Sequence, residues 1–327
     1  MTRRALALSA ATATLLVLAA CGSGTDPFDS DRPGGDSETP ADDAGGTAGG
    51  DSEGTAGGDS DVGPIVIGSQ AYYSNEIIAE LYAQVLEDAG HEVTRNFQIG
   101  QRDAYLQAMA GGEVHLLPEY TGNLLQFYDP ETEARSAEDV AAELPDALPD
   151  GLVVLDYAPA QDADSYNVTA EFAAEHGVAS LADLADFDGE ITIGGNAELE
   201  GRPYGPDGLQ EYYGIEVSFI AIGDSGGPLT KQAIREGTIT MGDIYSADPD
   251  LASGDFVTLD DPASMILAQN VVPLAAADVG DAIADVLAPV SEALTTEELI
   301  GLNARGQDED TAVDVIAGDW LRDKGLI

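Results

Sequence analysis

Short apolar runs alternate with helical patterns from Ile65 onward, and this alternation limits the possible fold more than any other feature. Ile65–Gly68 is typical of a buried strand. The apolar residues that follow recur at the spacing of one helix face: Ile77, Ile78, Leu81, Tyr82, Val85 and Leu86. Strands that alternate with helices favour an α/β fold with parallel sheets covered on both faces. In such folds ligands bind beyond the carboxyl ends of the strands.

The same patterns predict the other elements. Strands are expected at 65–68, 92–97, 114–117, 152–155, 191–194, 217–220, 239–244 and 256–259. Helices are expected at 74–90 and 102–110, around residues 171, 181, 209 and 229, and at 281–287, 296–304 and 311–322. Ser74 is expected to cap the first helix, and Pro118 to stop the third strand.

The N-terminus has the pattern of an export signal. Arg3 and Arg4 precede an apolar stretch that ends in Leu18-Ala19-Ala20-Cys21, a lipobox. We therefore expect a lipoprotein signal peptide at 1–20, lipidation of Cys21, and a mature protein that is extracytoplasmic and lipid-anchored to the cell membrane. The alternative is an ordinary secretory signal with an incidental cysteine, and the chain has no second cysteine for a disulfide.

Residues 21–61 are built almost wholly from Gly, Asp, Ser, Thr, Ala, Glu and Pro. Such a composition cannot bury a core, so this segment is expected to be a disordered linker between the lipid anchor and the folded part. A Gly-rich tether of roughly 40 residues spans about 35 Å.

Acidic residues outnumber basic ones by 61 to 12, and residues 21–61 hold only eleven of the acids. The folded part is therefore strongly negative, which makes nucleic acid and anionic substrates poor partners. Two interpretations stay open: a solvated surface suited to a saline habitat, or an attraction for cationic ligands. Residues 62–327 contain no Cys/His cluster, phosphate-binding loop or calcium-loop spacing, so we expect no cofactor and no metal.

Several short motifs occur in an order and at spacings that together are specific. Glu119-Tyr120-Thr121-Gly122 follows an apolar strand, and it is accompanied by motifs at 67–70, 78–82, 180–184, 194–202, 208–214, 302–303 and 320–321. With these motifs, nearly all of the chain after residue 61 resembles the osmoprotectant substrate-binding proteins of ABC importers. These are the glycine betaine, carnitine and choline receptors of the ProX/OsmF type.

The resemblance implies an α/β, two-lobe periplasmic-binding-protein fold of type II, a Venus flytrap with two crossover strands. With crossovers near 156–165 and 268–273, residues 62–160 plus 272–327 are expected to form lobe 1 and residues 161–271 lobe 2. It also implies a monomer, not an enzyme, that binds a small zwitterionic or cationic osmolyte between its lobes. The expected partners of that monomer are the permease subunits of an ABC transporter.

The chemistry of such a ligand indicates which side chains hold it. A quaternary ammonium has no N–H to donate, so it is held against aromatic faces, each worth about 0.5–2 kcal/mol. Micromolar affinity needs about 8 kcal/mol, so a polar clamp on the other end of the ligand is expected as well. By resemblance, Tyr120 and Tyr245 match cage tyrosines, and Arg202 matches a residue that grips the betaine carboxylate.

Other positions implied by the resemblance are polar or ambiguous. Gln70 stands where relatives often have Lys or Gln, and Asn123 where they often have Thr or Asp. A later cage tyrosine of the family is Gln269 here, and near the first crossover the matching residue is either Tyr166 or Asp164. A receptor for another small solute, such as an ectoine, an amino acid or a polyamine, is therefore the alternative on the same fold.

The segment Gly223-Asp224-Ser225-Gly226-Gly227-Pro228 reproduces the sequence around the nucleophile of chymotrypsin-like serine proteases. Those all-β enzymes activate the serine with a histidine and a buried aspartate, and His91, His115 and His176 all lack the expected sequence context. A turn before a helix that starts near Pro228 is the simpler interpretation. A secreted serine hydrolase that uses Ser225 is the less favoured alternative.

We predict that a fluorophosphonate probe does not label Ser225, because no histidine has the context needed to activate it. The measurement is the intact mass of the protein after treatment, with chymotrypsin as the positive control. A mass increase that disappears in Ser225→Ala would support the hydrolase.

Overall fold

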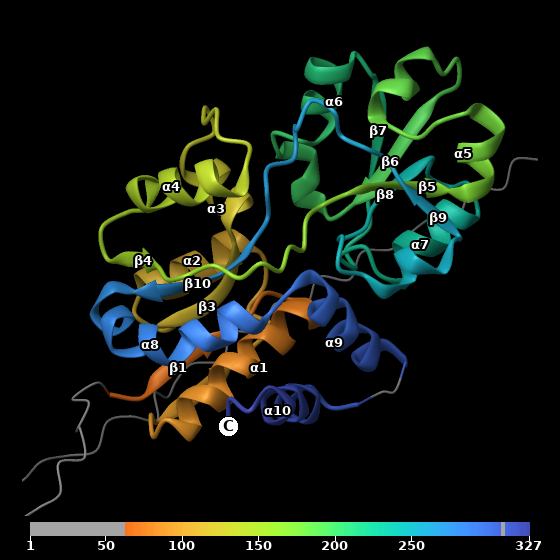
Figure 1. Ribbon diagram of the computed structural model, residues 1–327. Helices are drawn as coiled ribbons and strands as arrows, with labels where there is room; N and C mark the ends of the chain where they lie inside the picture. Colours follow the sequence, from red (N-terminus) through yellow and green to blue (C-terminus); the bar gives the residue numbers. More distant parts are fainter. Residues whose placement is uncertain (1–62, 309–310) are drawn as a thin grey trace, which may run out of the picture. The chain divides into compact units, whose positions relative to one another are not determined.

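The computed structural model describes residues 63–308 and 311–327, whose course is drawn in Figure 1. The predictions for the signal peptide at 1–20, for Cys21 and for the linker at 21–61 lie outside the described residues. In the part of the chain that is described, no helix is long and apolar enough to cross a membrane.

The first of two five-stranded sheets has the order β2-β1-β3-β10-β4. Its strands are β1 (Ile65–Gly68), β2 (Val93–Asn96), β3 (Leu116–Tyr120), β4 (Leu152–Val154) and β10 (Val271–Ala276). β1 runs parallel to β2 and β3, whereas β10, coloured blue in Figure 1, is antiparallel to both of its neighbours.

The second sheet has the order β7-β6-β8-β5-β9. Its strands are β5 (Tyr166–Thr169), β6 (Ile191–Gly195), β7 (Val217–Ala221), β8 (Met241–Asp243) and β9 (Phe256–Thr258). β6 is parallel to β7 and β8, and β5 is antiparallel to β8 and β9. Both sheets are thus mixed, which corrects the prediction of parallel sheets: each contains an antiparallel strand next to a crossing segment.

We call the half built on the first sheet lobe 1 and the half built on the second sheet lobe 2. The helices of lobe 1 are α1 (Tyr73–Asp88), α2 (Arg102–Ala110), α3 (Thr121–Tyr128), α4 (Ala137–Ala147), α8 (Ala277–Ala293), α9 (Thr296–Asp308) and α10 (Val313–Lys324). Those of lobe 2 are α5 (Ala170–His176), α6 (Pro206–Tyr213) and α7 (Pro228–Arg235), with short 3₁₀ segments at Leu181–Asp186, Ala197–Gly201 and Pro249–Ser253. The three C-terminal helices all contact α1.

Side chains of the first sheet alternate between two apolar cores. Ile65 and Ile67 of β1 pack with α1, α8 and α10, whereas Val66 between them packs with α2, α3 and α4. Leu116 and Leu117 of β3 divide in the same way. A strand buried on both faces has no polar alternation, which is why β1 and the start of β3 at Leu116 and Leu117 appear in the sequence as apolar runs.

Two segments of the chain cross between the sheets, residues 155–165 after β4 and residues 259–270 before β10. The two crossings pair with each other through an antiparallel bridge between Gln161 and Asn270. The first crossing agrees with the predicted 156–165. The second ends where β10 begins at Val271, so the crossing lies mainly before the predicted 268–273.

Two local predictions are wrong. Helix α1 begins at Tyr73 without a side-chain cap, and the hydroxyl of Ser74 instead donates to Asp162 at 3.0 Å. Pro118 lies inside β3 rather than at its end. It stands opposite Pro273 of β10, and in an antiparallel sheet such a pair fits at a position where neither residue exchanges hydrogen bonds with the other.

A buried ion pair joins α2 to β3. The guanidinium of Arg102 donates to the two carboxylate oxygens of Glu119 at 2.8 and 2.9 Å. Arg102 is 5% exposed and Glu119 is 0% exposed. Glu119 also accepts from the hydroxyl of Tyr105 and from the backbone N–H of Tyr120. The carboxylate is therefore fully bonded, so removal of its cation leaves a buried charge without a counter-ion.

We predict that Arg102→Met lowers the free energy of unfolding by about 3–5 kcal/mol, because Glu119 then loses its buried counter-ion. Urea denaturation of the ligand-free protein measures this change. Arg322→Met is the matched control, since Arg322 pairs with Asp319 at the surface, and its expected cost is at most about 1 kcal/mol. Equal losses in the two variants would argue against this role of the buried pair.

Candidate functional site

A polar cavity with about 40 Å³ of free space is lined by residues of both lobes. Gln70 lies after the carboxyl end of β1, Asn123 after β3, Asn196 after β6 and Tyr245 after β8. This is the position at which α/β sheets bind ligands. The first crossing segment adds two aspartates to the wall of the cavity.

Four tyrosines line the cavity: Tyr72, Tyr120, Tyr204 and Tyr245. The ring of Tyr72 is stacked with that of Tyr120 at a centroid distance of 6.5 Å, and it meets that of Tyr245 edge-on at 5.1 Å. The hydroxyl of Tyr72 donates to that of Tyr120 at 2.5 Å, and Asn196 donates to the hydroxyl of Tyr245 at 3.3 Å. Three of these rings thus form one connected cluster.

The phenols of the cavity are uncharged at neutral pH. Burial is the main cause that raises the pKa of Tyr72, Tyr120, Tyr204 and Tyr245 well above the usual value of 10.0, and nearby carboxylates raise it further. The rings therefore present neutral, electron-rich faces, which attract cations.

The two aspartates of the first crossing each accept hydrogen bonds from both lobes. Asp162 accepts from the hydroxyl of Ser74 in α1 and from the backbone N–H of Ala247 after β8, both at 3.0 Å. Asp164 accepts from Asn123 of α3 at 2.8 Å and from the hydroxyl of Tyr204 at 2.9 Å. The crossing segment therefore joins the lobes through its carboxyl groups as well as through its backbone.

A third carboxyl group, that of Asp243 at the end of β8, hydrogen-bonds with Asp164. Asp243 is 5% exposed, and burial together with the charge of Asp164 raises the pKa of Asp243 well above its usual value. Burial also raises the pKa of Asp162, to about 7.

The side chains of Gln70 and Arg202 offer N–H donors on the cavity wall. Gln70 is 8% exposed, and within the described residues its Nε2 atom has no hydrogen-bond partner. The half-buried guanidinium of Arg202 lies on the same wall. A buried donor without a partner costs about 1–3 kcal/mol, so Gln70 is suited to bind an oxygen atom of a ligand.

The structure brings five of the seven predicted site residues to the cavity: Gln70, Tyr120, Asn123, Arg202 and Tyr245. Tyr166 lies in the core of lobe 2, where its hydroxyl donates to the backbone carbonyl of Tyr204 at 2.7 Å. Gln269 is fully buried behind Asn123 and exchanges two hydrogen bonds with it, both of 2.9 Å. Of the alternatives Tyr166 and Asp164, it is Asp164 that lines the cavity.

Nine residues on the wall were not among the predicted site residues: Tyr72, Gln101, Arg102, Asp162, Asn196, Glu198, Leu199, Tyr204 and Asp243. Tyr72 lies in the loop that holds Gln70, Tyr204 lies two residues after Arg202, and Asp243 lies two residues before Tyr245. This closeness in the sequence to predicted site residues was the signal that could have identified them.

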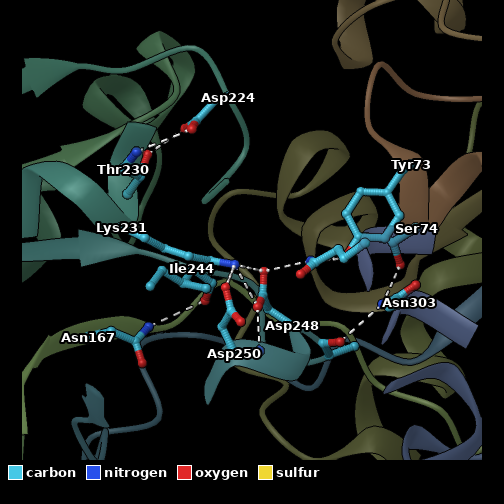
Figure 2. A network of polar contacts seen from close by, with 12 residues as sticks. Tyr73, Ser74, Asn167, Asp224, Thr230, Lys231, Ile244, Asp248, Asp250 and Asn303 are labelled. Atoms are coloured by element: carbon cyan, nitrogen blue, oxygen red, sulfur yellow. Dashed lines mark hydrogen bonds and ion pairs between the residues drawn. The ribbon is translucent and has the colours of Figure 1, made fainter. Parts of the chain in front are cut away.

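A second cavity, of about 520 Å³, shares Tyr72, Asp162 and Tyr245 with the first. Figure 2 shows the polar network beside it, in which the buried Lys231 forms ion pairs of 2.7 Å with both Asp248 and Asp250. The charge of Lys231 is therefore already compensated within the protein.

The loop that contains Ser225 is a turn before a helix, as predicted, since α7 begins at Pro228. The hydroxyl of Ser225 accepts a hydrogen bond from Asn196 at 3.1 Å, and its backbone N–H donates to the same side chain at 3.2 Å. Ser225 has a positive φ of 54°, which fits a tight turn.

Two α/β lobes joined by two crossings, with a polar cavity lined by both, define a solute-binding protein. Residues 63–323 match the OpuAC family, described as the substrate binding domain of the ABC-type glycine betaine transport system. Because the match spans most of the chain, this protein belongs to that family of extracytoplasmic binding proteins of ABC importers.

Individual relatives agree with this assignment. The glycine betaine-binding protein YehZ of Escherichia coli is 25% identical over 277 residues, which cover 80% of this chain and 91% of YehZ. A glycine-betaine-binding protein of Pseudomonas aeruginosa is 26% identical over 278 residues, covering 80% and 88%. In fold alone, the chain also matches a crystal structure described as that of a glycine betaine/carnitine/choline ABC transporter, with a TM-score of 0.65 at 16% identity, covering 80% of this chain and 99% of that one.

We predict that Asp162 lowers the stability of the ligand-free protein as the pH rises from 5 to 7. The folded protein keeps a proton on this residue up to about pH 7, whereas the unfolded chain loses it near 3.8. The contribution of Asp162 to the free energy of unfolding therefore falls over this range, by at most about 1.4 kcal/mol per pH unit.

Urea denaturation of the wild type and of Asp162→Asn at pH 5 and pH 7 measures this effect. The wild type is expected to lose up to about 3 kcal/mol relative to the variant between the two pH values. Asp146→Asn, at an exposed position in α4, is the matched control and is expected to differ from the wild type equally at both pH values. A pH-independent difference for Asp162→Asn would show that the residue does not titrate in this way.

Proposed function

We propose that this chain binds a quaternary-ammonium osmolyte of the glycine betaine, choline or carnitine type between its two lobes and delivers it to the permease subunits of an ABC importer. The observation that carries the proposal is the wall of four neutral tyrosines next to the carboxyl groups of Asp162, Asp164 and Asp243, in a protein of the glycine betaine-binding family. Such a wall suits a cation that carries no N–H donor.

The carboxyl groups favour a quaternary ammonium over a polyamine, which is the alternative that also brings positive charge. Asp162 and Asp164 each already accept two hydrogen bonds from the protein. An amine ligand needs free acceptors for its N–H groups, because an unpaired buried donor is costly. A quaternary ammonium needs only negative potential and aromatic faces, which this wall supplies.

The other end of the ligand is proposed to meet Gln70 and Arg202. Glycine betaine offers a carboxylate and choline a hydroxyl, and either provides the oxygen acceptor that the amide of Gln70 lacks. Arg202 suits a carboxylate, since its planar guanidinium can donate to two oxygens.

The sequence supports the remaining parts of the proposal. The lipobox at Cys21 and the linker at 21–61 support export and tethering to the cell membrane by lipid. We also propose that the protein acts as a monomer. We place the lobes at 62–160 plus 272–327 and at 161–271. We also propose that the chain is not an enzyme, since Ser225 is bonded to an asparagine in a turn.

Isothermal titration of the full chain with glycine betaine, choline and carnitine tests the ligand class. We expect micromolar binding of at least one of them, and Tyr120→Ala is expected to weaken it by up to about 30-fold through loss of one ring face. Tyr157→Ala is the matched control, because Tyr157 is 38% exposed and lies outside this cavity. Absence of heat with all three ligands would overturn the ligand assignment.

A second variant in the same titration separates the two ends of the ligand. Gln70→Met is expected to weaken choline and glycine betaine by about 2- to 13-fold, the equivalent of one hydrogen bond. Tetramethylammonium has no oxygen, so its affinity is expected to stay unchanged. If Gln70→Met weakened the binding of all three ligands equally, Gln70 would not be the residue that binds the ligand's oxygen atom.

A further inference from the structure

We propose that Asp162 gives up a proton when a cationic ligand enters the cavity, so that binding exchanges a proton for the positive charge of the ligand. This inference rests on the proposed function, because it assumes a cationic group next to the tyrosines. Asp162 acts as a positioning residue: it links the ligand's charge to the hydrogen bonds between the lobes.

The hydrogen bonds of Asp162 are those of a carboxylate. Its Oδ1 atom accepts from the backbone N–H of Ala247, and its Oδ2 atom accepts from the hydroxyl of Ser74. The hydroxyl of Ser74 is itself an acceptor for Asn303 at 3.2 Å, so its own proton is free to point at Asp162. A neutral Asp162 could donate its O–H only to the hydroxyl oxygen of Ser74, which would then have to turn its own proton away. Ionised Asp162 accepts both hydrogen bonds without such a change.

The surroundings of Asp162 disfavour that ionised form. The side chain is 5% exposed, and the charged and titratable groups that face it are Tyr72, Tyr73, Tyr120, Asp164, Asp243, Tyr245 and Asp248. No described hydrogen bond or ion pair joins Asp162 to a cation: Arg202 lines the same cavity without an ion pair to Asp162, and Lys231 in the neighbouring cavity is paired with Asp248 and Asp250. Burial and the charges of Asp164 and Asp248 raise the pKa of Asp162 to about 7. A cation held against Tyr72, Tyr120 and Tyr245 would add a counter-charge to this cluster of acids.

A separate observation indicates that this cavity holds a ligand. The Nε2 atom of Gln70 is buried on the same wall and lacks a hydrogen-bond partner among the described residues. In the exchange itself the O–H bond of the Asp162 carboxylic acid breaks, the carboxylate keeps the electron pair, and the proton goes to the buffer. The ligand is chemically unchanged.

The test is isothermal titration of the full chain with choline chloride in phosphate and in ACES, two buffers that differ in their heat of ionisation. With a pKa of about 7 in the free protein, we expect release of about 0.9 proton at pH 6 and about 0.1 at pH 8. The affinity is expected to rise about 10-fold between these pH values. A role of Asp162 in packing alone predicts the same heat in both buffers.

Variants assign the proton to a residue. Asp162→Asn is expected to bind choline with no proton release and with an affinity that does not change between pH 6 and pH 8. Asp146→Asn, which is exposed in α4, is expected to release the proton like the wild type. Release that is kept in Asp162→Asn would overturn the assignment.

The outcomes separate this inference from the proposed function. Absence of binding heat with choline and with glycine betaine would overturn both. Binding heat that is the same in phosphate and ACES at pH 6 would overturn this inference alone. If Asp162→Asn does not bind choline, the wild type alone still tests this inference. The number of protons that it releases on binding choline must fall from about 0.9 at pH 6 to about 0.1 at pH 8.

Discussion

The crossing segment between β4 and β5 carries the interaction on which the rest of the site depends. Asp162 and Asp164, two residues apart, each accept one hydrogen bond from lobe 1 and one from lobe 2. The same two carboxyl groups line the cavity, so the groups that join the lobes also determine the potential that a ligand meets.

The cavity combines neutral rings with acids in a way that suits one kind of ligand. The phenols stay protonated because they are buried, and their hydroxyls are bonded to one another or to Asn196 and Asp164. A ligand therefore meets ring faces and negative charge but few free acceptors. The charge of the ligand also affects the protonation of the acids, since a buried carboxyl group without a counter-ion stays neutral until a cation binds beside it. The membership in the glycine betaine-binding family agrees with this chemistry.

Much of the fold could be predicted from the sequence, but only part of the site. The alternation of patterns predicted β1 and α2 with the bounds that the structure has, because local periodicity determines them. It missed α3, α4 and β5, whose boundaries depend on packing between distant segments. Motifs predicted Tyr120 and Tyr245, whereas Tyr72 joins them through a contact across 48 residues. Likewise, Tyr204 reaches Asp164 across 40 residues, and no local pattern encodes such pairs.

A crystal structure of the protein with bound choline tests the central claim most directly. The account predicts that the trimethylammonium nitrogen lies within about 6 Å of the ring centroids of Tyr72, Tyr120 and Tyr245, with the choline oxygen at Gln70. Choline bound instead in the cavity beside Lys231, or away from the four tyrosines, would contradict the account.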